Sequence, residues 1–212
     1  MGKIDTHKNL DVHPFATYKS WLEWLEKNHR QTEGIWIKYA KQHTGIRTIS
    51  YEDSREGAII YGWIDGLINT LDDQFFLRKF TPRRPKSNWS KINREIAQQL
   101  IDKNAMKPSG IQQVMVAKKD GRWDAAYDSP STIAVPPELQ KLIESDKTAT
   151  ENFKKLSSAN RYAFLYRIQN AKLPATKKKH IDRAFEMLKS GTLYHPQKRK
   201  RFLGTTTPKK KK

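Results

Sequence analysis

The hydrophobic and polar positions of the N-terminal half follow two periods, one typical of helices and one typical of strands. Residues 14–28 carry apolar side chains at helical spacing and predict a first helix. Residues 34–39 then alternate, which is the period of two expected of a strand with one buried face. The predicted buried side chains are Ile35, Ile37 and Tyr39, and the predicted outer ones are Trp36 and Lys38.

A second helix is predicted where Ser50 precedes an acidic residue at near capping-box spacing. The pattern places Trp63 on the apolar face of this helix and ends the helix at Gly66. Two apolar runs follow, residues 67–71 and residues 75–80, and a pair of aspartates separates them. This arrangement predicts a β-hairpin.

The second strand of the hairpin leads into a basic loop, residues 80–95, which is the most informative stretch of the chain. Residues 74–94 contain no acidic side chain and seven cations, which are Arg78, Lys79, Arg83, Arg84, Lys86, Lys91 and Arg94. Such a stretch repels itself unless something negative is nearby. The charge pattern therefore predicts a surface that faces an anion.

The start of the following helix adds to this prediction. Two prolines stiffen the loop, and Ser87 or Asn88 is expected to cap a helix that opens at Trp89. Free backbone amides, the positive end of the helix dipole and flanking cations then suit a phosphate or carboxylate. The predicted anion-binding residues are Arg83, Arg84, Lys86, Ser87, Asn88, Lys91 and Arg94. The alternative is a solvated basic loop, because Trp89 already begins a core-facing apolar stripe.

Beyond residue 108 the hydrophobic pattern is helical. Helices are predicted after Pro108, from Pro136, from a capping box of Thr148 and Glu151, over residues 160–171, and over residues 175–190 before Gly191. The expected fold class is α+β, with a small antiparallel sheet and helices in the N-terminal half and a helical C-terminal half. The predicted parts are residues 1–108, residues 109–196 and a basic tail, residues 197–212, whose composition predicts disorder.

Composition and charge narrow the classes of partner. The 212 residues include 41 Lys and Arg against 22 Asp and Glu, a formal net charge of +19. Such a charge favours nucleic acid, an anionic membrane surface or acidic metabolites. The absence of cysteine excludes disulfides and thiolate metal sites, and the six histidines lack metal-ligand spacing. Because neither a signal peptide nor a membrane span is recognisable, we expect a cytoplasmic protein without a metal or cofactor.

Asp65 is the carboxylate of greatest interest, because it lies between Trp63 and the hairpin that leads to the basic loop. In a functional role it would orient Arg83 or Arg84, or act as an acid or base beside a bound anion. In a structural role, which we favour, it would cap the turn at Gly66 or pair with an arginine.

Four motifs in a fixed order resemble the YdeI/OmdA-like family of bacteriocin-protection and OmpD-associated proteins. They are YGWIDG, RKFTPRRPKSNWSKINRE, DGRWDAAYDSP and LSSANRYAFLYRIQNAK, and the resemblance spans residues 13–196. It implies an α+β N-terminal part, a helical C-terminal part, and an association with resistance to bacteriocins or cationic antimicrobial peptides. It implies no catalytic residues.

The leading hypothesis is a non-enzymatic anion-binding protein in such resistance, with RNA or DNA as the first ligand to test. Trp63, Trp89 and Trp123 are candidate stacking residues for bases if their rings are exposed. The alternative is an enzyme acting on a phosphorylated or carboxylated small molecule, with Asp65 as its only catalytic candidate. A third hypothesis is a protein-interaction module in the helical half, which burial of Phe153, Leu165, Ile168 and Phe185 would weaken.

Overall fold

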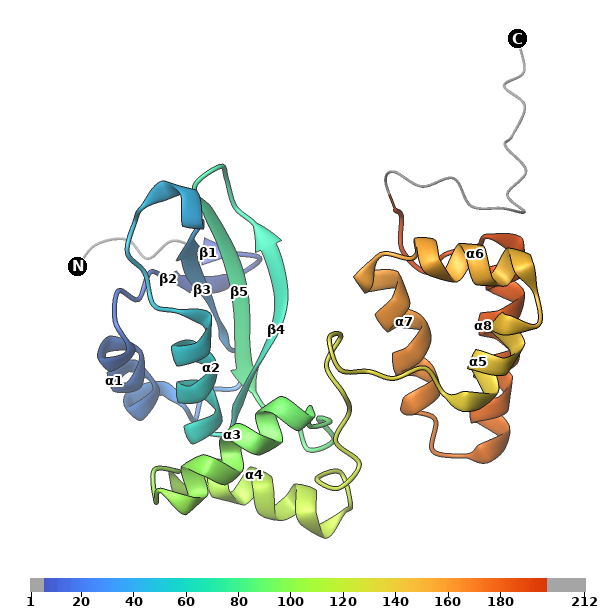
Figure 1. The fold of residues 1–212 in the computed structure, drawn as a ribbon. Helices are drawn as coiled ribbons and strands as arrows, with labels where there is room; N and C mark the ends of the chain where they lie inside the picture. The colour runs from blue at the N-terminus through green and yellow to red at the C-terminus, as the bar shows by residue number, and fades with distance from the viewer. Residues whose placement is uncertain (1–5, 198–212) are drawn as a thin grey trace. The chain divides into compact units, whose positions relative to one another are not determined.

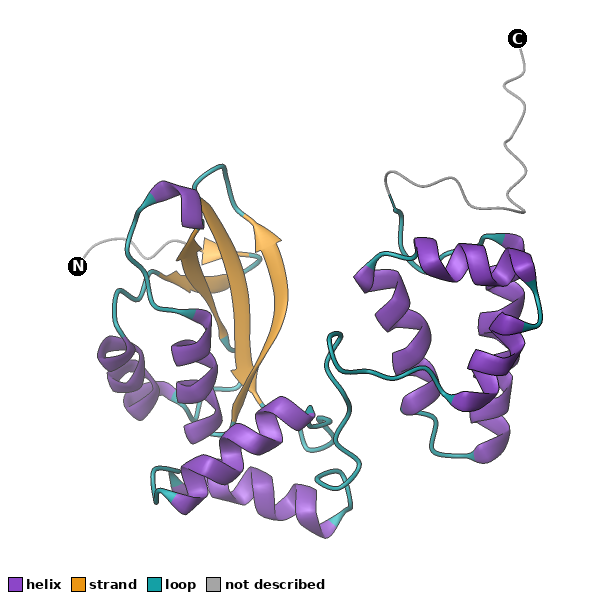
Figure 2. Cartoon of the chain, in the orientation of Figure 1, coloured by secondary structure: helices purple, strands orange, loops and turns teal. Residues whose placement is uncertain are grey.

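A computed structural model of the protein describes residues 6–197, and the chain divides into two compact units (Figure 1). The first unit extends to Ala126 and the second begins at Tyr127. Figure 2 shows strands and helices in the first unit and helices joined by loops in the second. The predicted α+β fold class, with a helical C-terminal half, is therefore confirmed.

The first unit contains a five-stranded sheet in the order β1-β2-β3-β5-β4. The strands are β1 (Thr6–His7), β2 (Leu10–His13), β3 (Ile35–Ala40), β4 (Trp63–Thr70) and β5 (Phe75–Pro82). The β2–β3 pair is parallel and the other pairs are antiparallel, so the sheet is mostly antiparallel, close to the prediction. The predicted hairpin is present as β4 and β5, and the Oδ1 atom of Asp72 accepts two backbone N–H groups in its turn.

Four α-helices and one short 3-10 helix complete this unit. They are α1 (Tyr18–Asn28), η1 (Gln42–Thr44), α2 (Tyr51–Ile60), α3 (Lys91–Asp102) and α4 (Pro108–Lys119). The main core collects aromatic and aliphatic side chains from these helices and from one face of the sheet, including Trp21, Trp63 and Phe80. The predicted first helix begins later than expected, at Tyr18, because Thr17 caps it by accepting the backbone N–H of Ser20.

Both faces of β3 are buried, which corrects the prediction of a single buried face. Ile35 and Ile37 pack in the main core, as predicted. Trp36, on the opposite face, is also buried and packs with Val12 of β2 and Leu77 of β5. Because the sequence did not predict β1 or β2, it did not indicate that the second face of β3 would be covered.

The predicted end of the second helix is also wrong. Helix α2 ends at Ile60, and Trp63 and Asp65 lie on β4 instead. Gly62 makes the reversal, because its φ is +78° and a Cβ there would come within 2.9 Å of the Ser109 carbonyl oxygen. The close approach of α4 therefore requires glycine at this position.

Helix α4 belongs to the first unit, whereas the sequence assigned it to the helical half. A Cβ atom at Gly110 would overlap the carbonyl oxygen of Ile60, so α4 lies directly against the end of α2. Val114, Ala117 and Trp123 join the main core of the first unit. These contacts explain why the units divide after Ala126 rather than at residue 108.

The second unit contains helices α5 (Pro137–Glu144), α6 (Lys147–Lys155), α7 (Ser158–Gln169) and α8 (Pro174–Ser190). Asp146, rather than the predicted Thr148, caps α6 by accepting the Ala149 N–H. Gly191 ends α8 in the left-handed conformation, as its position predicted. Of the predicted disordered tail, residues 198–212 lie outside the described residues.

Two buried amides hold the second unit together in addition to its apolar core. Asn152 of α6 donates to the carbonyl oxygen of Leu188 in α8 at 2.8 Å. Asn160 of α7 donates to the carbonyl oxygen of His195 and accepts the N–H of the same residue. The core itself is aliphatic and aromatic, and includes Leu165 and Ile168.

Candidate functional site

The basic loop between β5 and α3 is held by arginines from three places in the chain. Arg83 is 5% exposed, and its Nη1 atom donates to the Asn88 carbonyl oxygen at 3.2 Å. Its guanidinium carbon lies 3.6 Å from the centre of the Trp89 ring, within the range of a cation–π interaction. Arg94 donates to the Trp123 carbonyl oxygen, and Arg122 donates to the Ser87 carbonyl oxygen at 2.6 Å. These three guanidinium groups stabilise the loop by satisfying backbone carbonyls.

The three predicted stacking tryptophans are all buried. Trp89 and Trp123 pack edge to face with their ring centres 5.1 Å apart. Trp63 is fully buried, and its indole N–H donates to the His29 carbonyl oxygen. Since the faces of these rings are occupied by other side chains, they do not form a surface on which bases could stack.

The predicted caps of the following helix are wrong by two or three residues. Helix α3 begins at Lys91, and the hydroxyl oxygen of Ser90 accepts the Asn93 N–H. Ser87 has a different task, because its hydroxyl oxygen accepts the Arg84 N–H inside the loop. Asn88 contributes its carbonyl oxygen to Arg83 rather than a cap. The start of α3 is therefore capped by the protein itself.

Two cations of the loop remain directed to solvent. Arg84 and Lys86 are exposed, and no side-chain hydrogen bond or ion pair is found for either among residues 6–197. Lys118 of α4 is also exposed, and its Nζ atom lies 5.2 Å from the centre of the Trp123 ring. We call Arg84 and Lys86 the loop cations. Of the predicted anion-binding residues, Asn88 is also exposed, whereas Ser87, Lys91 and Arg94 are partly buried.

Asp65 lies in a separate charged cluster on the sheet. Its Oδ2 atom accepts from the Tyr51 hydroxyl at 2.9 Å and forms an ion pair with Arg78 at 2.8 Å. The Arg78 guanidinium also stacks 3.9 Å from the centre of the Tyr51 ring. Burial raises the pKa of the Tyr51 hydroxyl, and the negative charge of Asp65 raises it further. The structure thus gives Asp65 an arginine partner, but that partner is neither Arg83 nor Arg84.

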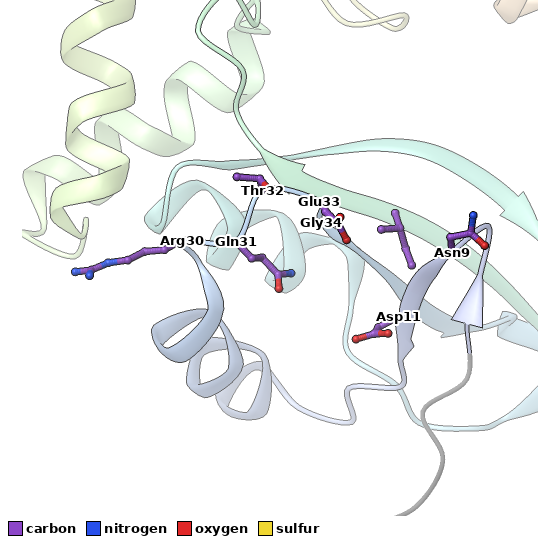
Figure 3. A pocket seen from close by; sticks show the side chains of 8 residues that line it. Asn9, Asp11, Arg30, Gln31, Thr32, Glu33 and Gly34 are labelled. Atoms are coloured by element: carbon purple, nitrogen blue, oxygen red, sulfur yellow. The ribbon is translucent and has the colours of Figure 1, made fainter.

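Two cavities occur elsewhere in the described part of the chain. One, in the first unit, has a volume of about 380 Å³ and is polar (Figure 3). Asp11, Gln31 and Glu33 are among its lining residues, while Arg30 extends away from the others in this view. The second, in the helical unit, has a volume of about 790 Å³ and lies along α5 and α8. Neither cavity is lined by Asp65 or by residues of the basic loop. No helix among residues 6–197 is long and apolar enough to span a membrane.

Comparison with known families divides the chain along the same lines as the fold. Residues 132–191, which cover α5 to α8, match the family described as bacteriocin-protection, YdeI or OmpD-associated. The helical unit is therefore similar to the YdeI/OmdA family over these residues. Residues 13–113 match a different description, a domain of unknown function (DUF8412). No curated protein and no solved structure matches the chain.

The YdeI/OmdA match is shorter than the resemblance seen in the sequence, which began at residue 13. The basic loop lies within the segment that matches the domain of unknown function, outside the YdeI/OmdA segment. The YdeI/OmdA description therefore refers to α5–α8 and not to the basic loop. The burial of Trp89 agrees with the alternative interpretation of the sequence, in which this residue begins a core-facing stripe. The burial of Arg83 could not be predicted from the sequence, since Arg122 and Trp123, which fix the loop, lie two helices further along the chain.

Proposed function

We propose that this protein is a non-enzymatic anion-binding protein whose first unit contacts the phosphates of RNA or DNA through the loop cations. The proposal rests on the observation that the cations of the loop have two kinds of surroundings. Arg83, Arg94 and Arg122 are used to hold backbone carbonyls, while Arg84 and Lys86 face solvent. A fixed loop presents its remaining cations without a large loss of chain entropy on binding.

Charge over the whole chain favours the same class of ligand. The formal net charge is +19, and residues 198–212 contribute eight of the cations. Such a distribution steers an anionic polymer to the protein and makes its affinity depend strongly on salt. The three candidate stacking tryptophans are buried, so their rings cannot stack on bases. We therefore expect the protein to contact phosphates rather than bases. Single strands should therefore bind no more tightly than duplexes.

The family description suggests a role in bacteriocin protection, and we extend the proposal to that process. A protein of net charge +19 does not attract a cationic peptide. We therefore propose an indirect role, in which the protein acts on a cytoplasmic anionic regulator or nucleic acid rather than on the peptide. The surroundings of Asp65 offer no support for the enzymatic alternative, because its charge is already paired with Arg78.

The test is a titration of fluorescent single-stranded RNA and of duplex DNA at two salt concentrations. Four proteins are compared: the intact chain, a chain ending at Gln197, Arg84→Ala/Lys86→Ala, and the matched control Arg47→Ala/Lys103→Ala. The control removes one arginine and one lysine that are also exposed in the first unit.

We expect saturable binding by the shortened chain. In the Arg84→Ala/Lys86→Ala variant, the magnitude of the slope of log affinity against log salt should fall by about two for duplex DNA, where about 0.9 of a counterion is released per phosphate contact, and by somewhat less for single-stranded RNA. The control variant should keep the slope of the intact protein. Loss of all binding on shortening, with no effect of the Arg84→Ala/Lys86→Ala change, would contradict the proposal and assign binding to the basic tail.

A further inference from the structure

The larger of the two cavities described above lies in the helical unit, far along the sequence from the basic loop. Its volume is about 790 Å³, and it is lined by α5, by the connection between α7 and α8, and by the first half of α8. Four apolar side chains contribute to its surface: Leu142, Ala171, Pro174 and Ile181. Ile181 belongs to the core of this unit, so the floor of the cavity is continuous with a packed interior. The cavity is therefore a feature of the folded unit.

Lysines surround this apolar floor. Lys141 comes from α5, Lys172 precedes α8, and Lys177 and Lys178 lie in its first turns. Two carboxylates also line the cavity, and one of them, Asp182, pairs with Lys178 at 3.3 Å. Lys141, Lys172 and Lys177 have no ion-pair or hydrogen-bonding partner for their ammonium groups within residues 6–197. The cavity thus carries an excess of positive charge over a hydrophobic surface.

The start of α8 adds to the positive potential at this place. Its N-cap residue is Leu173, whose side chain cannot accept a hydrogen bond, and Pro174 occupies the first turn. The next backbone N–H groups therefore have no side-chain cap, and the positive end of the helix dipole lies beside the lysines. Helix α5 also lacks a side-chain cap, but Glu138 in its first turn offsets part of its dipole.

We propose that this cavity binds a single-chain amphiphile with one anionic head group, a carboxylate or a phosphate. The volume lies within the range of about 300–1,000 Å³ that is typical of small-molecule sites. An alkyl chain would cover Leu142 and Ile181, and the head group would lie among the lysine ammonium groups. Lysine stems can extend along apolar surface while the charge stays in water, which suits such a ligand. This proposal is independent of the proposed binding by the loop cations.

Charge excludes two other occupants. The C-terminal segment of this chain, residues 198–212, carries eight cations and no acid, so the lysines would repel it. A cationic antimicrobial peptide would be repelled for the same reason. A ligand for this cavity must bring negative charge together with apolar surface.

Calorimetric titration of the intact protein tests the proposal with three probes that each have a chain of ten carbons, used below their micelle concentrations: decanoate, decyl phosphate and decyltrimethylammonium. We expect saturable binding of one or both anions, and no binding of the ammonium probe. Octanoate should bind more weakly than decanoate, by up to about fourfold for each methylene removed. Absence of binding by both anions, or equal binding of the ammonium probe, would overturn the proposal.

The site is located with two variants of equal charge. Lys141→Glu/Lys172→Glu changes the cavity, and Lys147→Glu/Lys154→Glu changes exposed lysines of α6. The first should weaken decanoate binding by about tenfold or more, and the second by less than about twofold. Circular dichroism verifies that both variants are folded, and amide chemical shifts of the full-length protein should change at Lys172 and along α8. Equal weakening by both variants, or shifts confined to the first unit, would contradict the site.

Discussion

The basic loop of the first unit and the cavity of the second unit both gather cations, but the two regions use them in opposite ways. In the loop, Arg83 is buried against Trp89, and its Nη1 atom donates to a carbonyl oxygen of the same loop. Around the cavity, Lys141 and Lys172 remain exposed beside an apolar floor. Positive charge therefore stabilises the fold in one region and is left available to a ligand in the other.

The chemistry of the arginine and lysine side chains accounts for this difference between the loop and the cavity. A guanidinium group is planar, weakly hydrated and rich in donors, so it can stack on an indole ring and bind carbonyl oxygens at the same time. A lysine ammonium is compact and strongly hydrated, and its burial without a partner is costly. The count of cations along a sequence thus says little about how many are free to bind an anion.

The largest expected effect concerns the ring beneath Arg83. Trp89→Ala should reduce the free energy of unfolding by about 3–5 kcal/mol, because the ring is buried and packs against Trp123 as well as the guanidinium. Urea unfolding followed by far-ultraviolet circular dichroism measures this loss. Trp89→Phe is the matched variant and should lose less, since it keeps an aromatic face under Arg83. A loss below about 1 kcal/mol in Trp89→Ala would show that the loop is not held in this way.

The two neighbouring arginines give the next largest contrast. Arg83→Ala should lower the free energy of unfolding by about 2–3 kcal/mol, since it removes a buried cation–π contact and a charged hydrogen bond. Arg84→Ala should change it by less than about 0.5 kcal/mol, because the side chain is exposed. Unfolding in urea, followed by tryptophan fluorescence, reports the first unit, because all six tryptophans precede Ala126.

Arg83→Lys separates shape from charge at the same position. Lysine keeps the charge but loses the planar face, so most of the loss seen in Arg83→Ala should remain. Full stability in Arg83→Lys would mean that charge alone holds the loop. Equal losses in Arg83→Ala and Arg84→Ala would remove the distinction between structural and exposed cations on which the proposed function rests.

Much of the fold followed from local pattern, and the exceptions have local or tertiary causes. The hairpin of β4 and β5 and the stop of α8 at Gly191 depend on turn residues that the sequence displays. Strands β1 and β2 are short, and they exist because β2 pairs with β3 and β1 pairs with β2, which no local signal indicates. The prediction that α2 ends at Gly66 is wrong because Gly62, with a φ of +78°, already reverses the chain, although the spacing of Trp63 fits the apolar face of a helix.

The candidate sites were predictable only in part. The basic loop is contiguous, so its charge was visible, but the residues that decide which arginines are buried come from beyond α4. The lysines of the cavity stand on α5 and α8, and only the packing of these helices brings them together. Likewise, Asp65 and Tyr51 meet through the packing of α2 on β4 rather than through sequence spacing.

His13 differs from both the buried Arg83 and the exposed lysines, because the fold favours the neutral form of its imidazole. Burial against Phe15 and Trp24 lowers the pKa of the imidazole from 6.5, and the carboxylate of Asp11 only partly opposes this. The unfolded chain then binds more protons below about pH 6.5 than the folded protein does. The free energy of unfolding should therefore fall as the pH falls through this value, until the folded protein also takes up the proton.

Urea titrations above and below pH 6.5 measure this dependence in the intact protein and in His13→Gln. The variant cannot be protonated at this position, so its stability should vary less with pH. His43→Gln, a change at an exposed histidine, is the control and should keep the dependence of the intact protein. An unchanged dependence in His13→Gln would show that the aromatic cluster accepts the charged form.

The smallest expected effect completes the contrast with Arg83. Lys141→Ala/Lys172→Ala should change the free energy of unfolding by less than about 0.5 kcal/mol, because both ammonium groups are exposed and unpaired within the described residues. Thermal unfolding followed by circular dichroism, with Lys147→Ala/Lys154→Ala as control, measures this change. A loss above about 1 kcal/mol would mean that the lysines support the fold, as the loop arginines do. A small gain in the free energy of unfolding, confined to the cavity variant, would instead show that the lysines repel one another in the intact protein. Such a cost in stability is expected where charged side chains serve to bind a ligand.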